Sequence, residues 1–409
     1  MSYVAAKGGT QAVLNSEQLI EYFRLQGESE PLKVRQVQEQ MRHAVDRSMS
    51  EGALYAPELA SLALKQSEGD TLEASFLLRA YRSTLPRVAC SLPVEGAQMR
   101  TLRRVSATFK DIPGGQMLGP SRDYQLRLLN TNLRTEADEQ RQQFLAQFGE
   151  LFPEQEAQDE EEGIFPKVVE SMRAQGILAE PPAQEQSEAQ AEPYDVTRKA
   201  ISFPAPRSAR LQILARGEVG SLLALAYSVV RGYGDVHPTL GELRFGYLPV
   251  AVAHPLTGEA VEIGEILATE CEMVSKVHTS DDEEAIREHK NVPPKFGLGY
   301  GFCFGHSEVK AMSMAILDRS VSAAKSGKQM GKEGPASDEE FVLQHVDGIE
   351  AGGFIAHFKL PHYVTFQADI SVLERARAHQ AERFAEKVRK RQQIEEQQAL
   401  FEQALDKKE

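Results

Sequence analysis

Apolar side chains in the first 90 residues recur every three or four positions, which is the spacing of one face of an α-helix. Pro57 suits the first turn of a helix, and Asp70 before Thr71-Leu72-Glu73 has the order of an N-cap with a carboxylate in the first turn. The pattern predicts a helical N-terminal layer with helices over 14–23, 34–49, 57–65 and 71–85.

Alternation of apolar and polar residues replaces this spacing further along the chain. Val105, Ala107 and Phe109 alternate with polar residues before Asp111-Ile112-Pro113-Gly114-Gly115 interrupts the pattern. A strand followed by a loop is therefore expected over 100–124.

The second half of the chain contains both patterns. From Ala368 on, apolar positions are sparse and charged residues frequent, which predicts one long helix that is solvated unless a partner covers it. The expected fold class is α+β, a helical N-terminal layer packed with a mixed α/β C-terminal region. The other expected elements are helices over 168–178, 219–230 and 308–322 and strands over 243–252 and 261–267.

Two segments, 154–162 and 180–194, are rich in Glu, Gln, Pro and Ala, which is typical of poorly ordered linkers. With these linkers as boundaries, the sequence predicts four regions. These are a helical region with the strand and loop over 1–150, a flexible linker with a short helix over 151–205, an α+β region over 206–367, and a charged helical tail over 368–409.

Composition narrows the classes of function. The chain has 409 residues and a formal net charge of −14, which argues against a broad nucleic-acid-binding surface. No apolar run approaches the roughly 18 residues of a membrane span, and the start lacks the layout of a signal peptide. A cytoplasmic protein without membrane or nucleic-acid partners is expected. Three scattered cysteines predict neither a disulfide framework nor an iron–sulfur cluster held by this chain alone.

Basic residues concentrate between Arg79 and Arg127, where nine stand against three acidic ones. Arg79 and Arg82 are three positions apart, so they share one face of a helix and could grip phosphate oxygens. The candidate anion loop that follows contains Lys110, Gly114, Gly115 and Arg122. A solvated surface with salt bridges is the alternative for each arginine.

Three carboxylates, Glu265, Glu270 and Glu272, lie in the apolar stretch Gly-Glu-Ile-Leu-Ala-Thr-Glu-Cys-Glu-Met-Val. Burial raises the pKa of a carboxyl group and can make it a general acid. Helix caps and salt bridges are the alternative roles.

Glycines alternate over 296–305 in Phe-Gly-Leu-Gly-Tyr-Gly-Phe-Cys-Phe-Gly, directly before a predicted helix. Glycine allows close approach of a phosphate, but the pattern is neither a Walker A loop nor a dinucleotide fingerprint. A tight strand-to-helix connection remains the alternative.

His357 and His362, in His-Phe-Lys-Leu-Pro-His, are the sharpest metal candidates. Imidazole nitrogen is a common ligand of zinc-type metals. Two ligands cannot complete a tetrahedral shell, so water, substrate, His345, Asp347 or a neighbouring chain could supply the rest. Two ordinary loop histidines are the alternative.

Several stretches resemble one family, in order along the chain. They include Tyr-Val-Ala-Ala-Lys-Gly-Gly from Tyr3, Ala-Val-Asp-Arg from Ala44, Phe-Leu-Leu-Arg-Ala-Tyr-Arg from Phe76, Lys-Asp-Ile-Pro-Gly-Gly-Gln-Met-Leu-Gly-Pro from Lys110, Thr-Glu-Cys-Glu-Met-Val from Thr269 and His-Phe-Lys-Leu-Pro-His-Tyr-Val from His357. The sequence is similar to the I subunit of the bacterial carbon–phosphorus lyase core complex. It departs from the family pattern near 150–195, after Ser280 and in the charged tail.

The resemblance implies a role in the use of alkylphosphonates as a phosphorus source. Family members act with G, H and J subunits and the associated L and K proteins. They help a phosphonate displace adenine from ATP to give a ribose 1-phosphonate 5-triphosphate, and alone they show nucleosidase activity. The family's zinc-binding histidines, near the contact with the J subunit, correspond to His357 and His362. A non-catalytic assembly scaffold and a free-standing metal-dependent nucleotide hydrolase remain alternatives.

Overall fold

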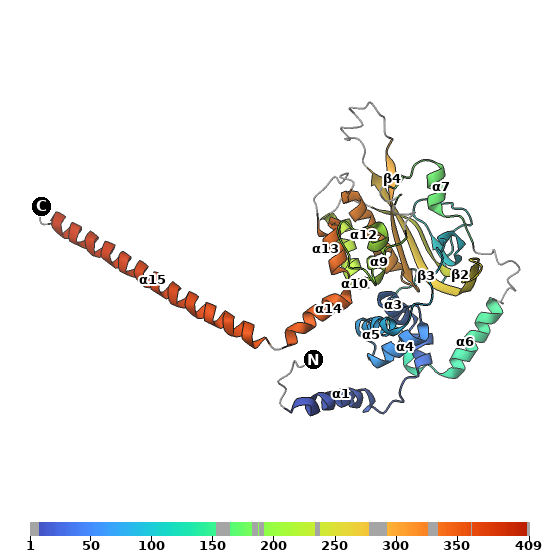
Figure 1. Cartoon of the computed structure of the whole chain (residues 1–409), viewed down its shortest axis with the longest axis horizontal. Helices are drawn as coiled ribbons and strands as arrows, with labels where there is room; N and C mark the ends of the chain where they lie inside the picture. The colour runs from blue at the N-terminus through green and yellow to red at the C-terminus, as the bar shows by residue number, and fades with distance from the viewer. Residues whose placement is uncertain are drawn as a thin grey trace. The chain divides into compact units, whose positions relative to one another are not determined.

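A computed structural model describes residues 8–406 except 153–163, 182–186, 188–191, 234–237, 278–292, 326–333 and Pro361 (Figure 1). The chain folds into two compact units. The larger comprises Gly27–Ala351, and the smaller comprises Met1–Gln26 together with Gly352–Glu409.

A four-stranded antiparallel sheet in the order β1-β2-β3-β4 forms the centre of the larger unit. Its strands are β1 (Arg100–Val105), β2 (Thr239–Ala253), β3 (Ala260–Val277) and β4 (Lys295–Phe304). The predicted strands at 243–252 and 261–267 are confirmed and extend further. Residues 296–304 belong to β4 and Gly305 follows the strand before α12 begins at Glu308, so the alternative of a strand-to-helix connection holds for these glycines.

The glycines of β4 let a helix pack closely on this strand. A Cβ atom on Gly301 would lie 2.0 Å from the carbonyl oxygen of Ala311, and one on Gly299 would lie 2.1 Å from that of Ala315. Only glycine lets the backbone of α12 (Glu308–Lys325) approach the sheet this closely.

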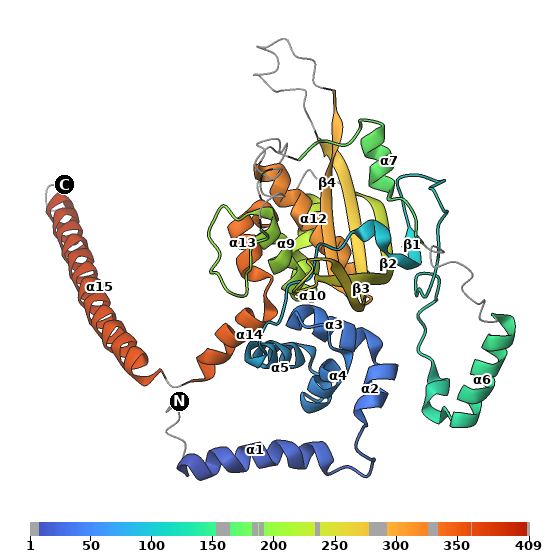
Figure 2. The ribbon, with the colours of Figure 1, turned by 45° about the vertical axis from the view of Figure 1, so that its right-hand side comes forward.

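Helices cover one face of the sheet, and Figures 1 and 2 place α12 on that side and α7 (Val168–Ala174) on the other. The main core lies beneath α12 and includes Leu214, Leu222, Leu243 and Met314, all at most 2% exposed. The helices that join α12 in this layer are α9 (Arg207–Arg216), α10 (Val219–Ser228), which continues as a π-helical turn at Val229–Tyr233, and α13 (Glu339–His345).

The predicted helices between residues 34 and 85 pack around a second core that includes Met49, Leu64 and Leu78, whereas the predicted helix over 14–23 is α1 (Gly9–Leu25) of the smaller unit. Asp70 caps α5 as expected, because its side chain accepts hydrogen bonds from the backbone N–H groups of Leu72 and Glu73. The predicted helix over 34–49 is divided in two. The helices are α2 (Val34–Gln40), α3 (Arg42–Gly52), α4 (Pro57–Gln66) and α5 (Thr71–Thr84).

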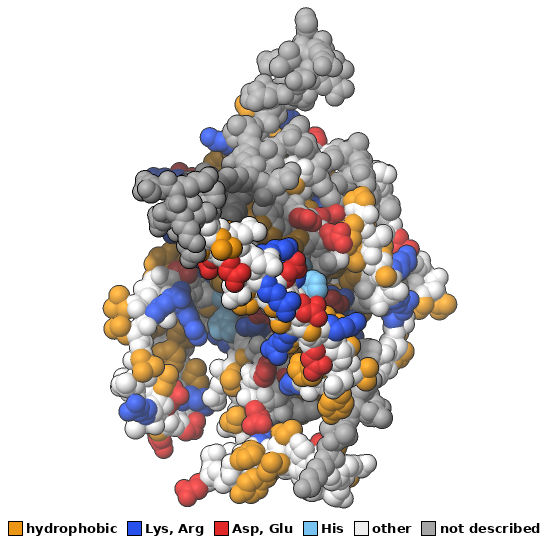
Figure 3. Space-filling model, turned by 90° about the vertical axis from the view of Figure 1, so that its left-hand side faces the viewer, with side chains coloured by type: hydrophobic (Ala, Val, Ile, Leu, Met, Phe, Trp, Pro, Cys, Tyr) orange, Lys and Arg blue, Asp and Glu red, His pale blue; other side chains and the backbone are white. Residues whose placement is uncertain are grey.

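The smaller unit consists largely of α1 (Gly9–Leu25) and α15 (Tyr363–Asp406), the long C-terminal helix expected from the sequence. Charged and apolar side chains are both visible on the face shown in Figure 3. The remaining helices are α6 (Asp138–Leu151) and α14 (Gly348–Ala356), with 3-10 turns at Gly96–Gln98, Thr131–Thr135, Pro335–Ser337 and His357–Lys359.

The α+β fold class is confirmed. The division at 150, 205 and 367 stays a prediction, and the predicted acidic segment 154–162 and the insertion after Ser280 lie outside the described residues. Within the described part of the chain, no single helix is long and apolar enough to cross a membrane. One pair, Arg207–Arg216 with Val219–Arg231, passes by length and composition but is bent by 118°.

Candidate functional site

Glu270 and Glu272 lie side by side on β3, two residues apart and therefore on the same face of the sheet. Both are almost fully buried, at 2% and 3% exposed. Lys167 lies 2.9 Å from Glu270 Oε1 and 2.5 Å from Glu272 Oε1, so it bridges the two carboxylates. The predicted burial of these carboxylates is confirmed. Glu265 is half-exposed and forms an ion pair with Arg100 instead.

Glu270 has two further partners. Arg244 lies 2.6 Å from its Oε2 atom, and the Tyr300 hydroxyl donates a hydrogen bond of 2.9 Å to Oε1. Burial opposes ionisation, but the charges of Lys167 and Arg244 outweigh it and lower the pKa of Glu270. This carboxylate fits the salt-bridge alternative.

Glu272 differs from Glu270 because its Oε2 atom is buried without a hydrogen-bond partner. Burial raises the pKa of Glu272 to about 7, against the opposing charge of Lys167 and with a further contribution from Glu270. Neighbouring carboxyl groups with separated pKa values are the arrangement that supplies one acid and one stabilising anion.

A third carboxylate on this face, Glu242, forms an ion pair with Arg104 in which both side chains are at most 1% exposed. We call Lys167, Arg104, Arg244, Glu242, Glu270 and Glu272 the buried ion-pair cluster. It contains equal numbers of basic and acidic side chains. Lys167 was missed from the sequence, because only tertiary packing brings it to the sheet.

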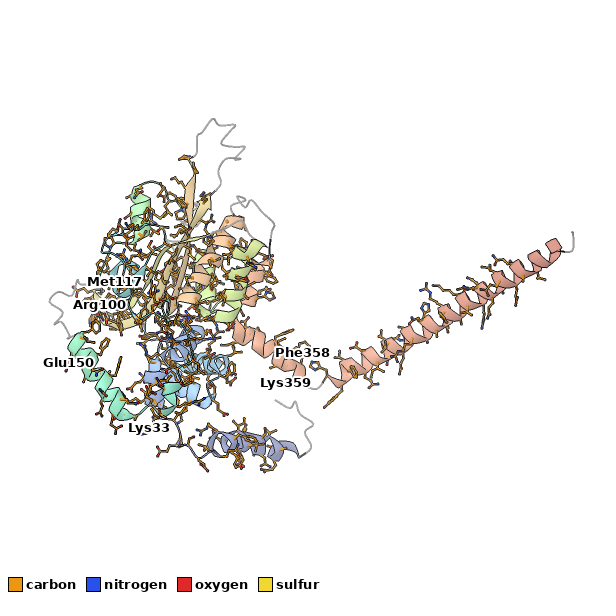
Figure 4. All side chains as sticks on the ribbon, turned by 180° about the vertical axis from the view of Figure 1, so that it is seen from behind. Lys33, Arg100, Met117, Glu150, Phe358 and Lys359 are labelled. Atoms are coloured by element: carbon orange, nitrogen blue, oxygen red, sulfur yellow. The ribbon has the colours of Figure 1, made fainter. Side chains whose placement is uncertain are left out.

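The predicted anion loop follows β1 and is tied back to it. Arg104 and Met117 exchange two backbone hydrogen bonds of 2.8 Å, and Figure 4 labels Met117 near Arg100 of β1. Lys110 and Arg122 are exposed. Gly114 and Gly115 have φ values of +80° and +74°, which favour glycine.

Gly114 also has no room for a side chain, because a Cβ atom there would lie 2.1 Å from the ring of Phe165.

Arg103 and Arg104 point to opposite faces of the sheet, as expected for neighbours on a strand. Arg103 contacts Glu308 at 2.6 Å, whereas Arg104 contacts Glu242. Both arginines also bind loop carbonyl groups, of Leu118 and Pro113 respectively.

Arg79 and Arg82 share a face of α5, as predicted, and both contact carbonyl groups at the end of α3. Arg79 forms an ion pair with Asp347 at 2.6 Å and also binds the carbonyl oxygen of Arg216, so protein partners occupy its guanidinium. Arg82 binds only the carbonyl oxygen of Ala53 within the described residues. These arginines pack on α3, whereas the 110–122 loop packs on β1.

His357 begins the 3-10 turn whose Phe358 and Lys359 are labelled in Figure 4, and His362 follows this turn. Their ring centroids are 5.4 Å apart. Each Nδ1 atom faces a backbone carbonyl oxygen, that of Phe354 for His357 and that of Leu360 for His362. Because a carbonyl group only accepts, both Nδ1 atoms must donate, which leaves each Nε2 lone pair free for a metal.

The described residues contain no group of three or more His, Cys, Asp and Glu side chains that could hold a metal ion. His345 and Asp347, considered as further ligands, belong to the other unit, where Asp347 binds Arg79. Zinc binding by His357 and His362 therefore stays a prediction.

Comparison with known proteins identifies the family. The sequence model of "Bacterial phosphonate metabolism protein (PhnI)" matches residues 2–380. The chain belongs to the PhnI family. The resemblance inferred from the sequence is therefore confirmed, and the family match ends inside α15.

Three relatives of known description cover more than nine-tenths of this PhnI-family chain. A "Putative C-P lyase subunit protein HtxH" of Stutzerimonas stutzeri is 49% identical over 91% of this chain and 95% of its own. Two proteins are named "Alpha-D-ribose 1-methylphosphonate 5-triphosphate synthase subunit PhnI". The one from Escherichia coli is 44% identical over 92% of this chain and 99% of its own, and the one from Rhizobium meliloti is 42% identical over 92% and 95%.

Proposed function

We propose that this chain is a subunit of a carbon–phosphorus lyase core complex and helps an alkylphosphonate displace adenine from ATP. The observation that carries the proposal is the shared name of two relatives, a synthase subunit for α-D-ribose 1-methylphosphonate 5-triphosphate. That compound has a phosphonate on C1 of ribose and a triphosphate on C5. Replacing the base of ATP with methylphosphonate yields it directly.

The reaction is a substitution at the anomeric carbon. A phosphonate oxygen forms a bond to C1, the bond from C1 to N9 of adenine breaks, and its electron pair leaves with the base. The proton of the phosphonate balances the proton that the departing adenine takes up. With water in place of the phosphonate, the same site acts as a nucleosidase. Catalysis therefore requires a proton donor and stabilisation of positive charge on ribose.

Glu272 suits the proton donor, because its pKa of about 7 leaves it partly protonated at neutral pH. Glu270, held ionised by Lys167 and Arg244, suits the stabilising anion. The proposal requires Lys167, which covers both carboxylates, to move aside when the nucleotide binds.

For the anionic groups of the substrates, we assign Arg82 and the loop residues Lys110, Gly114, Gly115 and Arg122. Arg79, whose guanidinium is occupied by protein partners, has the role of a positioning residue in this scheme.

His357 and His362 are the proposed zinc ligands of this chain, with the J subunit completing the shell. A zinc ion there supplies a Lewis acid for ligand oxygens. Replacing both histidines with Ala should lower the zinc content of the assembled complex and leave the fold intact, since His362 is exposed and His357 is only half-buried. Elemental analysis decides this, and zinc retained at full stoichiometry in the double variant would remove the site from the proposal.

The proposed partners are the G, H and J subunits and the associated L and K proteins. Exposed apolar side chains give such partners a surface to bury, including Phe144, Leu145, Phe148 and Leu151 of α6. The scaffold alternative uses the same surface without chemistry.

Chromatography of free adenine separates these possibilities. The purified chain with ATP should release adenine slowly by hydrolysis, and added partners with methylphosphonate should divert the ribose to the phosphonate ester. Absence of adenine from every combination of subunits supports a scaffold. Full activity of the chain alone, unaffected by phosphonate, supports the free-standing hydrolase.

A further inference from the structure

A cavity of about 460 Å³ lies within the larger unit, beside the C-terminal end of the edge strand β4. The ends of α3, α5 and α9 line it, together with segments around 87–91 and 192–197. Its volume falls in the range typical of sites for small organic ligands. None of the sites assigned above, apart from Arg82, lies in its wall.

Two arginines in this wall lack a carboxylate partner among the described residues. Arg82 binds one backbone carbonyl group, and the Nε atom of Arg216 is buried without any hydrogen-bond partner. Asp195 and Glu192 also line the cavity, but Asp195 is engaged by Arg87 at 2.6 Å. Neither Arg82 nor Arg216 therefore forms an ion pair with a carboxylate among the described residues, although Asp195 and Asp347 offset part of their charge.

Burial and neighbouring positive charges lower the pKa of both Arg82 and Arg216. Burial lowers the pKa of Arg82, and the charges of Arg79 and Arg87 lower it further. Burial and the charge of Arg79 likewise lower the pKa of Arg216, against the opposing charge of Asp347. An anion between these guanidinium groups would relieve the repulsion.

A buried ammonium group lies behind the same cavity. Lys310 is 0% exposed, and its Nζ atom donates a hydrogen bond of 2.8 Å to the hydroxyl group of Ser50, which lines the cavity. Glu51, whose charge acts on Lys310, forms its ion pair with Arg47 at 2.9 Å. The charge of Glu51 offsets part of the cost of burying Lys310, and Lys310 adds a third positive charge behind the wall that contains Arg82 and Arg216.

Apolar side chains form much of the remaining wall, with Phe302, Phe304, Ala53 and Ala215 among them, beside polar groups such as Gln212 and Thr197. Such a wall suits the carbon-containing part of a ligand, because it removes apolar surface from water. Inorganic phosphate alone would leave this wall unused.

We infer that this cavity binds an organic phosphate or phosphonate, with its oxyanion held by Arg82 and Arg216 and its organic part against Phe302 and Phe304. The inference rests on the proposed function only in its choice of candidate ligands. A nucleoside triphosphate and an alkylphosphonate share this chemistry.

Isothermal titration of the full chain with ATP, adenosine, methylphosphonate and inorganic phosphate tests the assignment. Arg216→Gln and Arg82→Gln should each weaken binding of the phosphorylated or phosphonate ligand roughly 10-fold or more. Adenosine binding should be unaffected. Arg35→Gln is the matched control, because Arg35 is an exposed arginine paired with Glu39 on α2.

The titrations with ATP and with methylphosphonate distinguish a nucleotide ligand from a phosphonate ligand. An effect on ATP alone assigns the nucleotide, and an effect on methylphosphonate alone assigns the phosphonate. Equal losses for adenosine, or unchanged binding of every ligand in both variants, would overturn the inference. Circular dichroism and the Arg216→Lys variant, which keeps the charge and should recover part of the affinity, guard against a folding defect. Binding here without release of adenine in any combination of subunits refutes the proposed function and leaves this inference standing.

Discussion

The buried ion-pair cluster and the cavity beside β4 are two charged regions of the same unit that differ in one respect. In the cluster, each of Lys167, Arg104 and Arg244 has a carboxylate partner within 2.9 Å. In the cavity wall, Arg82 and Arg216 have none among the described residues, and Lys310 behind it donates its hydrogen bond to the Ser50 hydroxyl group, with the charge of Glu51 acting on it.

This difference separates charges that the folded chain satisfies from charges that require a ligand. Removing a member of the first group should cost stability, whereas removing a member of the second should cost binding. Glu272 is the exception within the cluster, because one of its oxygen atoms has no partner.

The largest change in the free energy of unfolding is expected for a substitution in the buried ion-pair cluster. Glu242→Leu leaves Arg104 without its carboxylate, and Arg104 is 0% exposed. The free energy of unfolding should fall by about 3–5 kcal/mol. Urea denaturation measures it, and the double variant Arg104→Met/Glu242→Leu should be more stable than the single one. A loss below about 1 kcal/mol would mean that water replaces the missing carboxylate.

Substitution of Lys310 is expected to raise the free energy of unfolding rather than lower it. Burial lowers the pKa of Lys310 to about 8 from an unfolded value near 10.5, so the fold disfavours its charged form. Lys310→Met should therefore raise the free energy of unfolding at pH 7 by roughly 1–3 kcal/mol. The gain should shrink as pH rises from 8 toward 10.5, where the wild-type lysine is neutral in both states.

Thermal or urea unfolding at pH 7 and pH 10 tests this difference. Lys276→Met, at an exposed position of β3, is the control and should change stability little at either pH. A destabilised Lys310→Met variant would show that the ammonium group is well compensated by the protein.

Glu272 is expected to make a smaller contribution to the free energy of unfolding, and this contribution depends on pH. Its folded pKa of about 7 lies above the unfolded value near 4.5, so the folded state binds the proton more tightly. This group's contribution to stability is fully present below pH 4.5 and is lost as pH rises through about 7. The loss is roughly 1 kcal/mol for each pH unit inside that window.

Glu272→Gln should remove this slope. Unfolding free energies at pH 5.5 and pH 6.5 for the wild type and the variant give the comparison directly. Identical slopes would mean that Glu272 is ionised across this range and is no proton donor.

Much of the fold could be predicted from the sequence because periodicity is a local property. The helix at 71–84 has both its spacing and its Asp70 cap in adjacent residues. Strand β4 was missed because its glycines resemble a loop locally, and only the closeness of α12 explains them.

The candidate site was less predictable for the same reason. Burial of Glu270 and Glu272 followed from their apolar neighbours, but their pairing with Lys167 depends on residues about a hundred positions away. Arg216 ends α9 and meets Arg82 only through tertiary packing, so no local signal marked it.

The smallest stability effect is expected in the cavity. Arg216→Gln removes a charge that is repelled by Arg79 and Arg82, so the free energy of unfolding should change by less than about 0.5 kcal/mol. Denaturation without added ligand measures it. A loss approaching that of Glu242→Leu would end the distinction between the two regions.

Product analysis of the assembled complex supplied with ATP and methylphosphonate tests the proposed function most directly, with phosphorus NMR for the phosphonate and triphosphate and chromatography for adenine. The account predicts that esterified phosphonate and free adenine accumulate in equal amounts while the triphosphate chain stays intact. Formation of ADP and inorganic phosphate, with adenine still attached to ribose and the phosphonate unchanged, would contradict it.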